Sequence, residues 1–222
     1  MKTKLFFLSI IFVILFTLFS YIVAKERLIK VDFDTTVKLQ DHISRRFDKY
    51  FSYFSLLASA EVTIGFCIIM AFLCLIKFNW RAFLGWLMII PASLGEVFGK
   101  LVLFHPAPPV FLHRSILSTA LPSFYVHTDF SYPSGHMTRT LFITTILLCM
   151  VIFGTKNNLY RLMVSLFLSI LVFMMALTRI YLGEHWLSDV IGGSLLGAGA
   201  GFFASILIVR TGKNVSFLKA KD

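Results

Sequence analysis

Charged residues are scarce in this sequence. Only 14% of its 222 residues are Asp, Glu, Lys or Arg, whereas 58% are hydrophobic, and the mean hydropathy is +0.84. A soluble domain of this size needs a far more polar surface. The apolar residues also stand in long uncharged runs instead of recurring at amphipathic spacing. The composition therefore predicts that lipid surrounds most of the chain.

Cysteines are few, and no polar surface carries a continuous basic stripe. Cys67, Cys74 and Cys149 all lie inside apolar runs, which argues against a disulfide framework and against a zinc site. The formal net charge is +10, but the basic residues stand in short clusters between apolar runs. This distribution is typical of membrane anchoring and argues against a nucleic-acid partner.

Six apolar runs are each long enough to cross a bilayer, which needs about 20 residues per helix. The first is favoured as an uncleaved anchor, because it is long for a signal peptide and no small-x-small cleavage site follows it. Between the first two spans, a mixed-charge segment over residues 25–50, including Val37, Ile43 and Phe47, is a candidate interfacial amphipathic helix. The six expected spans are 5–24, 54–76, 82–103, 137–153, 162–177 and 190–209.

The distribution of basic residues predicts the orientation of the spans. The segment before the second span carries acids and bases in comparable number, whereas the segments assigned to the opposite face are almost purely basic. The positive-inside rule then places both termini in the cytoplasm. The basic residues assigned to the cytoplasmic face are Lys2, Lys4, Lys77, Arg81, Lys156, Arg161, Arg210, Lys213, Lys219 and Lys221.

Glycines recur at four-residue spacing in the last span, at Gly193, Gly197 and Gly201. Residues at this spacing lie on one side of a helix, where small side chains allow another helix to approach closely. We expect a helix-packing face there.

Three unusually polar stretches lie beside span ends, all on the non-cytoplasmic face of the expected topology. They are KLVLFHPAPP (residues 100–109), YPSGHMTR (132–139) and TRIYLGEHWLSD (178–189). Ionisable groups at membrane depth are costly and usually functional. The chemistry of the protein is therefore expected in these three stretches.

The residue types in the second and third stretches indicate phosphate chemistry. His185 and Asp189 are four residues apart at the expected start of the sixth helix, so the carboxylate can hold one imidazole nitrogen and leave the other as a nucleophile. Arg179 can bind phosphate oxygens through its planar fork. Ser134 and nearby backbone N–H groups would form an anion site where the fourth helix begins. His136 follows, placed to give a proton to a leaving oxygen.

The first stretch adds a further cation, Lys100. Glu96, one helical turn earlier, is positioned to pair with it and to hold its orientation.

Together these residues resemble the type 2 phosphatidic acid phosphatase (PAP2) superfamily. The Pro-Ser-Gly-His motif is intact at 133–136, and the Arg-x5-His-x3-Asp motif is intact at Arg179, His185 and Asp189, with Thr178 where the family usually has Ser. The motifs cover about residues 100–189, and the six-span layout extends the resemblance to nearly the whole chain. The resemblance implies an all-α bundle of six transmembrane helices forming a single domain, 1–222, with a motif core at about 96–209.

The resemblance also implies roles. His185 would be the nucleophile that forms a phosphohistidine, Asp189 would orient it, and His136 would protonate the leaving group. The family works without a metal or other cofactor. Its substrates would be membrane lipid phosphates of the undecaprenyl diphosphate, phosphatidylglycerophosphate, phosphatidic acid or lipid A type, reached between the third, fourth and sixth helices at the outer leaflet of the cell membrane. Lys100, Ser134, Gly135 and Arg179 would hold the phosphoryl oxygens.

One position departs from the family pattern. Where the family has Arg before Pro in the first motif, this chain has His105 before Pro106. Three interpretations stand: His105 serves as a weaker phosphate ligand, Arg114 or Arg139 supplies the missing charge, or the site is catalytically degraded. A neutral imidazole brings at most one donor and no fixed charge.

Several alternatives remain open on the sequence. A metal site built from His105, His113, His127 and His185 lacks any supporting ligand spacing. Arg139 could instead snorkel from a helix start, and Glu61 could be a buried partner for a site cation or face a polar crevice. A lipid-to-lipid phosphotransferase and a non-catalytic transporter or flippase on the same scaffold are the competing functions. The sequence does not indicate an oligomeric state.

Overall fold

The protein is described by a computed structural model that covers residues 1–117 and 130–209. These residues fold into α-helices joined by turns and short 3-10 helices. The helices are α1 (Lys2–Ala24), α2 (Ile29–His42), α3 (Asp48–Ser55), α4 (Ala60–Ile76), α5 (Trp80–Leu87), α6 (Ile89–Leu103), α7 (Gly135–Gly154), α8 (Asn158–Tyr181) and α9 (Leu187–Ile208), with 3-10 turns at Arg45–Phe47, Leu56–Ala58 and Val110–Leu112.

Six helical segments within the described residues are long and apolar enough to cross a membrane, so the prediction of six spans is confirmed. The segments extend past the apolar runs, because helical geometry continues through polar residues at the span ends. The fifth, expected at 162–177, reaches Tyr181, so Arg179 lies in the last turn of α8. The segments are Lys2–Ala24, Arg45–Ile76, Trp80–Leu103, Gly135–Gly154, Asn158–Tyr181 and Leu187–Ile208.

The third span is interrupted between α5 and α6. Pro91 stands near the start of α6, and proline can neither donate a helical hydrogen bond to the carbonyl four residues earlier nor fit closely against it. That carbonyl belongs to Leu87, the last residue of α5. The break therefore has a local cause in the sequence.

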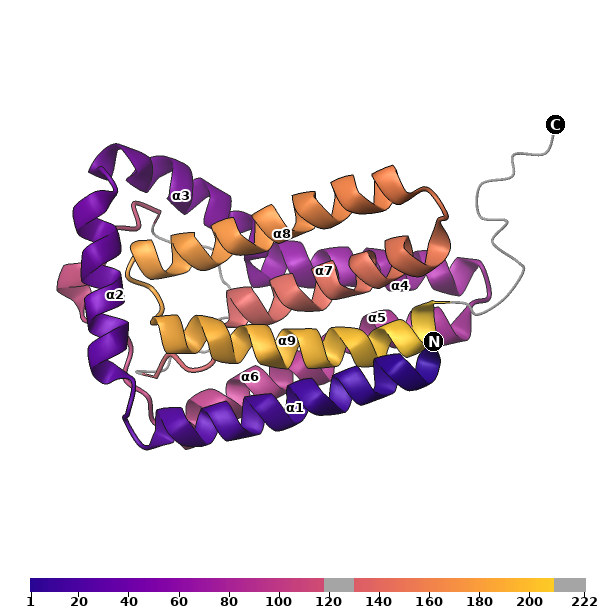
Figure 1. The fold of residues 1–222 in the computed structure, drawn as a ribbon, viewed down its shortest axis with the longest axis horizontal. Coiled ribbons are helices and arrows are strands. Elements are labelled where there is room, and N and C mark those ends of the chain that lie inside the picture. The colour runs from indigo at the N-terminus through magenta and orange to yellow at the C-terminus, as the bar shows by residue number, and fades with distance from the viewer. Residues whose placement is uncertain (118–129, 210–222) are drawn as a thin grey trace.

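Helix α9 is the centre of the bundle, with α1 along one side and α7 along another (Figure 1). A Cβ atom added at Gly193 would lie 2.3 Å from the backbone oxygen of Ser134, and one at Gly197 would lie 2.2 Å from that of Thr138. Only glycine, whose side chain is a hydrogen atom, allows α9 to approach α7 this closely, so the expected packing face is confirmed. It brings the Pro-Ser-Gly-His turn against the first turns of α9.

Helix α2 crosses one end of the bundle at a steep angle to the spans (Figure 1). Asp32, Thr36 and Gln40 recur every four residues and form its buried face, whereas Ile29 and Phe33 are exposed. A helix was expected in this segment, but Ile43 and Phe47 lie beyond its end. The polar face of α2 points into the protein.

Two backbone carbonyls anchor the C-terminal half of α2. The Gln40 amide donates to the oxygens of Leu112 and Tyr181, at 2.7 and 2.8 Å. Both acceptors belong to segments near the three polar stretches, so α2 lies over the end of the bundle where those stretches meet.

The N-terminus and the turns between α4 and α5 and between α7 and α8 lie at the other end of the bundle (Figure 1). The basic residues Lys77, Arg81, Lys156 and Arg161 belong to those turns or adjoin them. Residues Arg210, Lys213, Lys219 and Lys221, also assigned to that face, lie outside the described residues.

Candidate active site

Asp189 and His185 form an interacting pair at the start of α9. Asp189 Oδ2 lies 3.3 Å from His185 Nδ1 and accepts a 2.9 Å hydrogen bond from the backbone N–H of Trp186. Asp189 is the third residue of α9 and completely buried, whereas His185 precedes the helix. The expectation that His185 and Asp189 both stand at the start of the sixth helix is therefore wrong for His185, and a capping turn brings the two residues together. With Nδ1 at the carboxylate, Nε2 is the nitrogen left for substrate.

The imidazole of His185 is kept in its neutral form. Burial lowers its pKa well below the ordinary value, and the positive charges of Arg179 and Lys100 lower it further. A neutral ring has the lone pair that nucleophilic attack requires.

Gly183 shapes the loop that presents His185. Its φ of +66° lies in the left-handed region, and a Cβ atom there would lie 2.2 Å from the backbone oxygen of Leu112. After this turn the N–H groups of Glu184 and His185 both donate to the carbonyl of Arg179, at 3.3 Å. The loop thus folds back onto the end of α8.

The Pro-Ser-Gly-His turn is joined directly to the His–Asp pair. The backbone N–H of Ser134 donates to the carbonyl of Asp189 at 3.0 Å, and Ser134 stands at the N-cap of α7. Its hydroxyl is buried and has no hydrogen-bond partner within the described part of the chain. A buried hydroxyl at a helix N-terminus is suited to an anion. His136, partly buried in the first turn of α7, is close enough to His185, Arg179 and Lys100 to interact with them electrostatically.

Glu96 holds two cations beneath this turn. Its carboxylate is 3.0 Å from Lys100 Nζ and 2.8 Å from Arg139 Nη1, so the pairing of Glu96 with Lys100 is confirmed. Arg139 is 7% exposed, which contradicts the snorkelling interpretation. A Cβ atom at Gly135 would lie 2.1 Å from Glu96 Oε1, so the carboxylate packs against the backbone of the turn. Two positive charges against one negative charge leave this cluster net positive.

Arg179 reaches the site from α8. Its side chain is 1% exposed, hydrogen-bonds to the hydroxyl of Ser55 at 2.5 Å and forms an ion pair with Glu184. The site was expected between the third, fourth and sixth spans. The fifth span also contributes, because α8 continues far enough to carry Arg179 to this end of the bundle.

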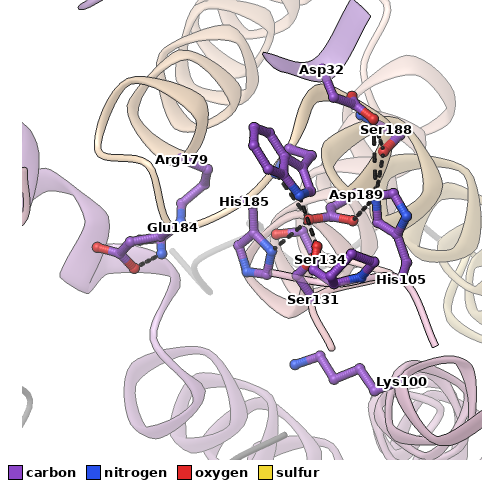
Figure 2. Close-up of polar contacts among 12 residues, drawn as sticks. Asp32, Lys100, His105, Ser131, Ser134, Arg179, Glu184, His185, Ser188 and Asp189 are labelled. Carbon is purple, nitrogen blue, oxygen red and sulfur yellow. Dashed lines mark hydrogen bonds and ion pairs between the residues drawn. The ribbon is translucent and has the colours of Figure 1, made fainter. Parts of the chain in front are cut away.

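His105 lies on the opposite side of Asp189 from His185 (Figure 2). Its Nε2 is 3.2 Å from the hydroxyl of Ser188 and 3.7 Å from Asp189 Oδ1, the oxygen that His185 does not engage. The same nitrogen is 3.9 Å from Asp32 Oδ2. His105, the residue that departs from the family motif, therefore lies beside the carboxylate of Asp189.

Asp32, from α2, was not anticipated as part of the site. It is 1% exposed and accepts hydrogen bonds from the backbone N–H and the hydroxyl of Ser188, both at 2.8 Å. Burial raises the pKa of Asp32 above its ordinary value, and the hydrogen bonds from Ser188 oppose this rise only in part. The i,i+4 spacing of Asp32, Thr36 and Gln40 could have predicted this contribution. It places the three polar side chains on one face of a helix, and such a face can pack against a polar site inside the protein.

The remaining residues that the sequence suggested lie elsewhere. Arg114 Nη1 donates to the Tyr181 hydroxyl at 3.2 Å, and its guanidinium lies over the Tyr181 ring. Glu61 is exposed in the first turn of α4, so the buried-partner interpretation is wrong. His113 is exposed, and His127 lies outside the described residues. Within residues 1–117 and 130–209, no group of three or more His, Cys, Asp or Glu side chains is arranged to hold a metal ion.

A groove of about 420 Å³ runs between α7 and α8. It begins beside the site, because Met137 follows His136 and Ala176 lies one turn before Arg179. The hydroxyls of Thr144 and Ser194 donate to carbonyls of their own helices, which leaves the lining mainly apolar. The other lining residues are Leu141, Thr145, Leu148, Ser165, Leu168, Ser169, Val172 and Phe173.

Two solved structures share this fold. The PAP2-type phosphatidylglycerolphosphate phosphatase of Bacillus subtilis superposes with a TM-score of 0.69 at 17% identity, covering 88% of this chain and 93% of that one. LpxE of Aquifex aeolicus superposes with a TM-score of 0.54 at 22% identity, covering 78% and 94%. At these identities the likeness concerns the fold alone.

Sequence comparison gives a more specific result. An undecaprenyl-diphosphatase of Sulfolobus acidocaldarius is 33% identical over 124 residues, which are 56% of this chain and 52% of that protein, so the chain matches about half the length of this relative. The family model of the PAP2 superfamily matches residues 80–213, which is more than half of the chain and includes all three polar stretches. The chain therefore belongs to the PAP2 superfamily of membrane lipid phosphatases.

Proposed function

We propose that this protein hydrolyses a phosphomonoester or diphosphate of a membrane lipid through a phosphohistidine at His185. The observation that carries the proposal is the geometry of the His185–Asp189 pair. A neutral imidazole is held by a buried carboxylate at Nδ1, and buried cations from three helices lie around it. This is the arrangement that a nucleophile needs to attack an anionic phosphoryl group.

In the first step, Nε2 of His185 attacks phosphorus and a P–N bond forms. The bond between phosphorus and the leaving oxygen breaks, and His136, held protonated by the negative charge of the bound phosphate, gives its proton to that oxygen, which releases the lipid alcohol or lipid monophosphate. Asp189 stabilises the positive charge that the His185 ring acquires.

In the second step, water attacks the phosphohistidine. His136, now neutral, takes a proton from the water, the P–N bond breaks, and its electron pair returns to His185. Inorganic phosphate leaves and both histidines regain their starting forms. Each proton is thus given and recovered by groups of this chain.

Fixed donors hold the phosphoryl oxygens in both steps. Lys100 and Arg179 supply charge, Ser134 supplies a buried hydroxyl, and the N–H of Gly135 lies at the N-terminus of α7. Arg139 acts through Glu96, which it shares with Lys100. This inventory of charged groups favours catalysis over the degraded-site and transporter interpretations.

The groove between α7 and α8 supports a lipid as the substrate. We assign it to a hydrocarbon chain of the substrate because it is apolar, is lined by residues that lie next to His136 and one turn from Arg179 along their helices, and is about 17 Å long from Met137 to Leu148 at 1.5 Å per residue. The phosphate would then be at the polar end of the bundle while the chain stays at membrane depth.

The substrate class and topology complete the proposal. Undecaprenyl diphosphate is favoured, since the relative that is 33% identical to this chain is an undecaprenyl-diphosphatase. Phosphatidylglycerophosphate, phosphatidic acid and lipid A phosphates remain candidates through the family resemblance. Basic residues gather at the end of the bundle opposite the site, which supports cytoplasmic termini and a non-cytoplasmic active site. We treat residues 1–222 as one domain.

A panel of lipid phosphates, offered to the purified protein in detergent, tests the proposal. Phosphate release from at least one lipid is expected, together with loss of turnover in His185→Ala and a large loss in Asp189→Asn. Movement of phosphate to a second lipid, without release, would instead identify a phosphotransferase. Full turnover by His185→Ala would contradict the proposal.

A further inference from the structure

Asp32 lies outside the residues that the family model matches, which begin at residue 80, yet two hydrogen bonds and one 3.7 Å polar contact link it to Asp189. Asp32 binds Ser188, Ser188 contacts His105, and His105 contacts the carboxylate of Asp189 (Figure 2). All four side chains are buried, at 5% exposure or less.

The direction of these hydrogen bonds follows from counting protons. Asp32, as a carboxylate, only accepts, so the single hydroxyl proton of Ser188 goes to Asp32 Oδ2 at 2.8 Å. The Ser188 oxygen then accepts from its other neighbour, which is His105 Nε2 at 3.2 Å. His105 must therefore carry a proton on Nε2.

The proton on His105 Nε2 lies close to the carboxylate of Asp189. His105 Nε2 is also 3.7 Å from Asp189 Oδ1, so its N–H presents a positive edge to the oxygen that His185 leaves unengaged. The arginine that the family has at this position donates from every nitrogen, whereas a neutral histidine donates from Nε2 only in the tautomer that carries the proton there. Asp32 and Ser188 fix it here.

We propose that Asp32 is a positioning residue for the lipid phosphatase reaction. Through Ser188, it sets the proton of His105 on Nε2 and so allows histidine to replace the arginine of the family as the donor beside Asp189. This inference rests on the proposed function of the His185–Asp189 pair. It also gives α2, which crosses the bundle end, a positioning role in the reaction.

A structural role for Asp32 is the competing explanation, because Asp32 Oδ1 also accepts the backbone N–H of Ser188 in the first turn of α9, at 2.8 Å. Asp32→Asn separates the two roles. The amide oxygen must stay at the Ser188 N–H, since an NH2 group there would meet a second donor. The NH2 group then takes the place of Oδ2 and donates to the Ser188 hydroxyl. The helix cap is preserved, while the hydroxyl is turned toward His105.

The test measures steady-state turnover of a lipid phosphate that the wild-type protein hydrolyses. Asp32→Asn is expected to lower kcat by about 10-fold to 100-fold, with KM changed by less than about 2-fold. This range is typical of losing an outer hydrogen-bond partner that orients a residue of a functional site. Asp41→Asn, the same change at an exposed position of α2, serves as the matched control and should retain wild-type kcat. If Asp32→Asn retains wild-type kcat while Asp32→Ala loses it, Asp32 is only a helix cap and the proposal is overturned.

A double-mutant cycle tests the route through Ser188. Ser188→Ala removes the hydroxyl whose hydrogen-bond direction Asp32→Asn would reverse. In the Ser188→Ala background, adding Asp32→Asn should therefore lower kcat by less than about 3-fold. An equal loss in both backgrounds would contradict the relay.

The tautomer of His105 can be measured without turnover, by nitrogen-15 NMR of the histidine rings with His105→Gln to assign the signal. The wild-type ring is expected to carry a proton on Nε2, and Asp32→Asn should reduce that population. A wild-type Nε2 without a proton, or identical His105 signals in both proteins, would overturn the proposal. Absence of wild-type turnover would instead count against the proposed function and leave this measurement to decide the relay.

Discussion

Gly135→Ala should lower the activity of this protein much more than its stability. The added Cβ atom would lie 2.1 Å from Glu96 Oε1 and 2.4 Å from Glu96 Cδ, whereas ordinary contacts begin near 3.4 Å. The carboxylate must therefore move by about 1.3 Å, the difference between those distances. Because the obstacle is the end of a side chain and not backbone, the free energy of unfolding should fall by only about 1 kcal/mol.

The effect on turnover should be much larger. Glu96 holds Lys100 at 3.0 Å and Arg139 at 2.8 Å, so its displacement moves the cations beneath the phosphate site. A misplacement of about 1 Å can cost about 100-fold in rate, and we expect a loss of that order in kcat/KM for Gly135→Ala.

Phosphate release from a lipid substrate and thermal unfolding would be measured on the same preparations. Gly154→Ala is the matched control, because it lies in the same helix and its Cβ would meet nothing within 4 Å. Adding Glu96→Asp to Gly135→Ala removes one methylene and should restore part of the activity. Wild-type kcat/KM in Gly135→Ala would refute the claim that Glu96 positions the cations.

Three further outcomes follow from other contacts. Gly197→Ala should lower the free energy of unfolding by about 1–3 kcal/mol, measured by denaturant titration, because its Cβ would lie 2.2 Å from the backbone oxygen of Thr138; unchanged stability would contradict this. The acidic limb of the pH profile of kcat/KM should lie below pH about 6.5, because the lowered pKa keeps His185 neutral. Lys100→Met removes a positive charge beside His185 and should move this limb to higher pH, and a shift to lower pH would contradict the proposed effect of Lys100 on His185. Ala176→Phe should lower kcat/KM about 10-fold for long-chain lipids but not for short-chain, water-soluble analogues, and equal losses for both would exclude the groove as the chain site.

The spans and the motif residues could be predicted because their signals are local. Uninterrupted apolar runs predict membrane helices by length alone, and the i,i+4 spacing of Glu96 and Lys100 predicts their ion pair. The glycine spacing in α9 likewise predicts a close helix contact. Each of these inferences needs only the neighbouring sequence.

The contributions from distant segments could not be predicted in the same way. Asp32 meets Ser188 across more than 150 residues, and no spacing rule relates them. Ser55 reaches Arg179 in the same manner. The sequence left two interpretations of Glu61 open, and only the fold shows that the residue stands exposed in the first turn of α4. His105 could be recognised as a departure, but its partners required the fold.

The most direct test of the central claim is to trap the phosphoenzyme. Purified protein would be mixed with a lipid carrying labelled phosphate, quenched within the first turnover, and digested to locate the label. The account predicts acid-labile, base-stable phosphate on His185, absent in His185→Ala and diminished in Asp189→Asn. Label on another residue, or rapid phosphate release by the wild-type protein with no labelled intermediate at any quench time, would contradict it.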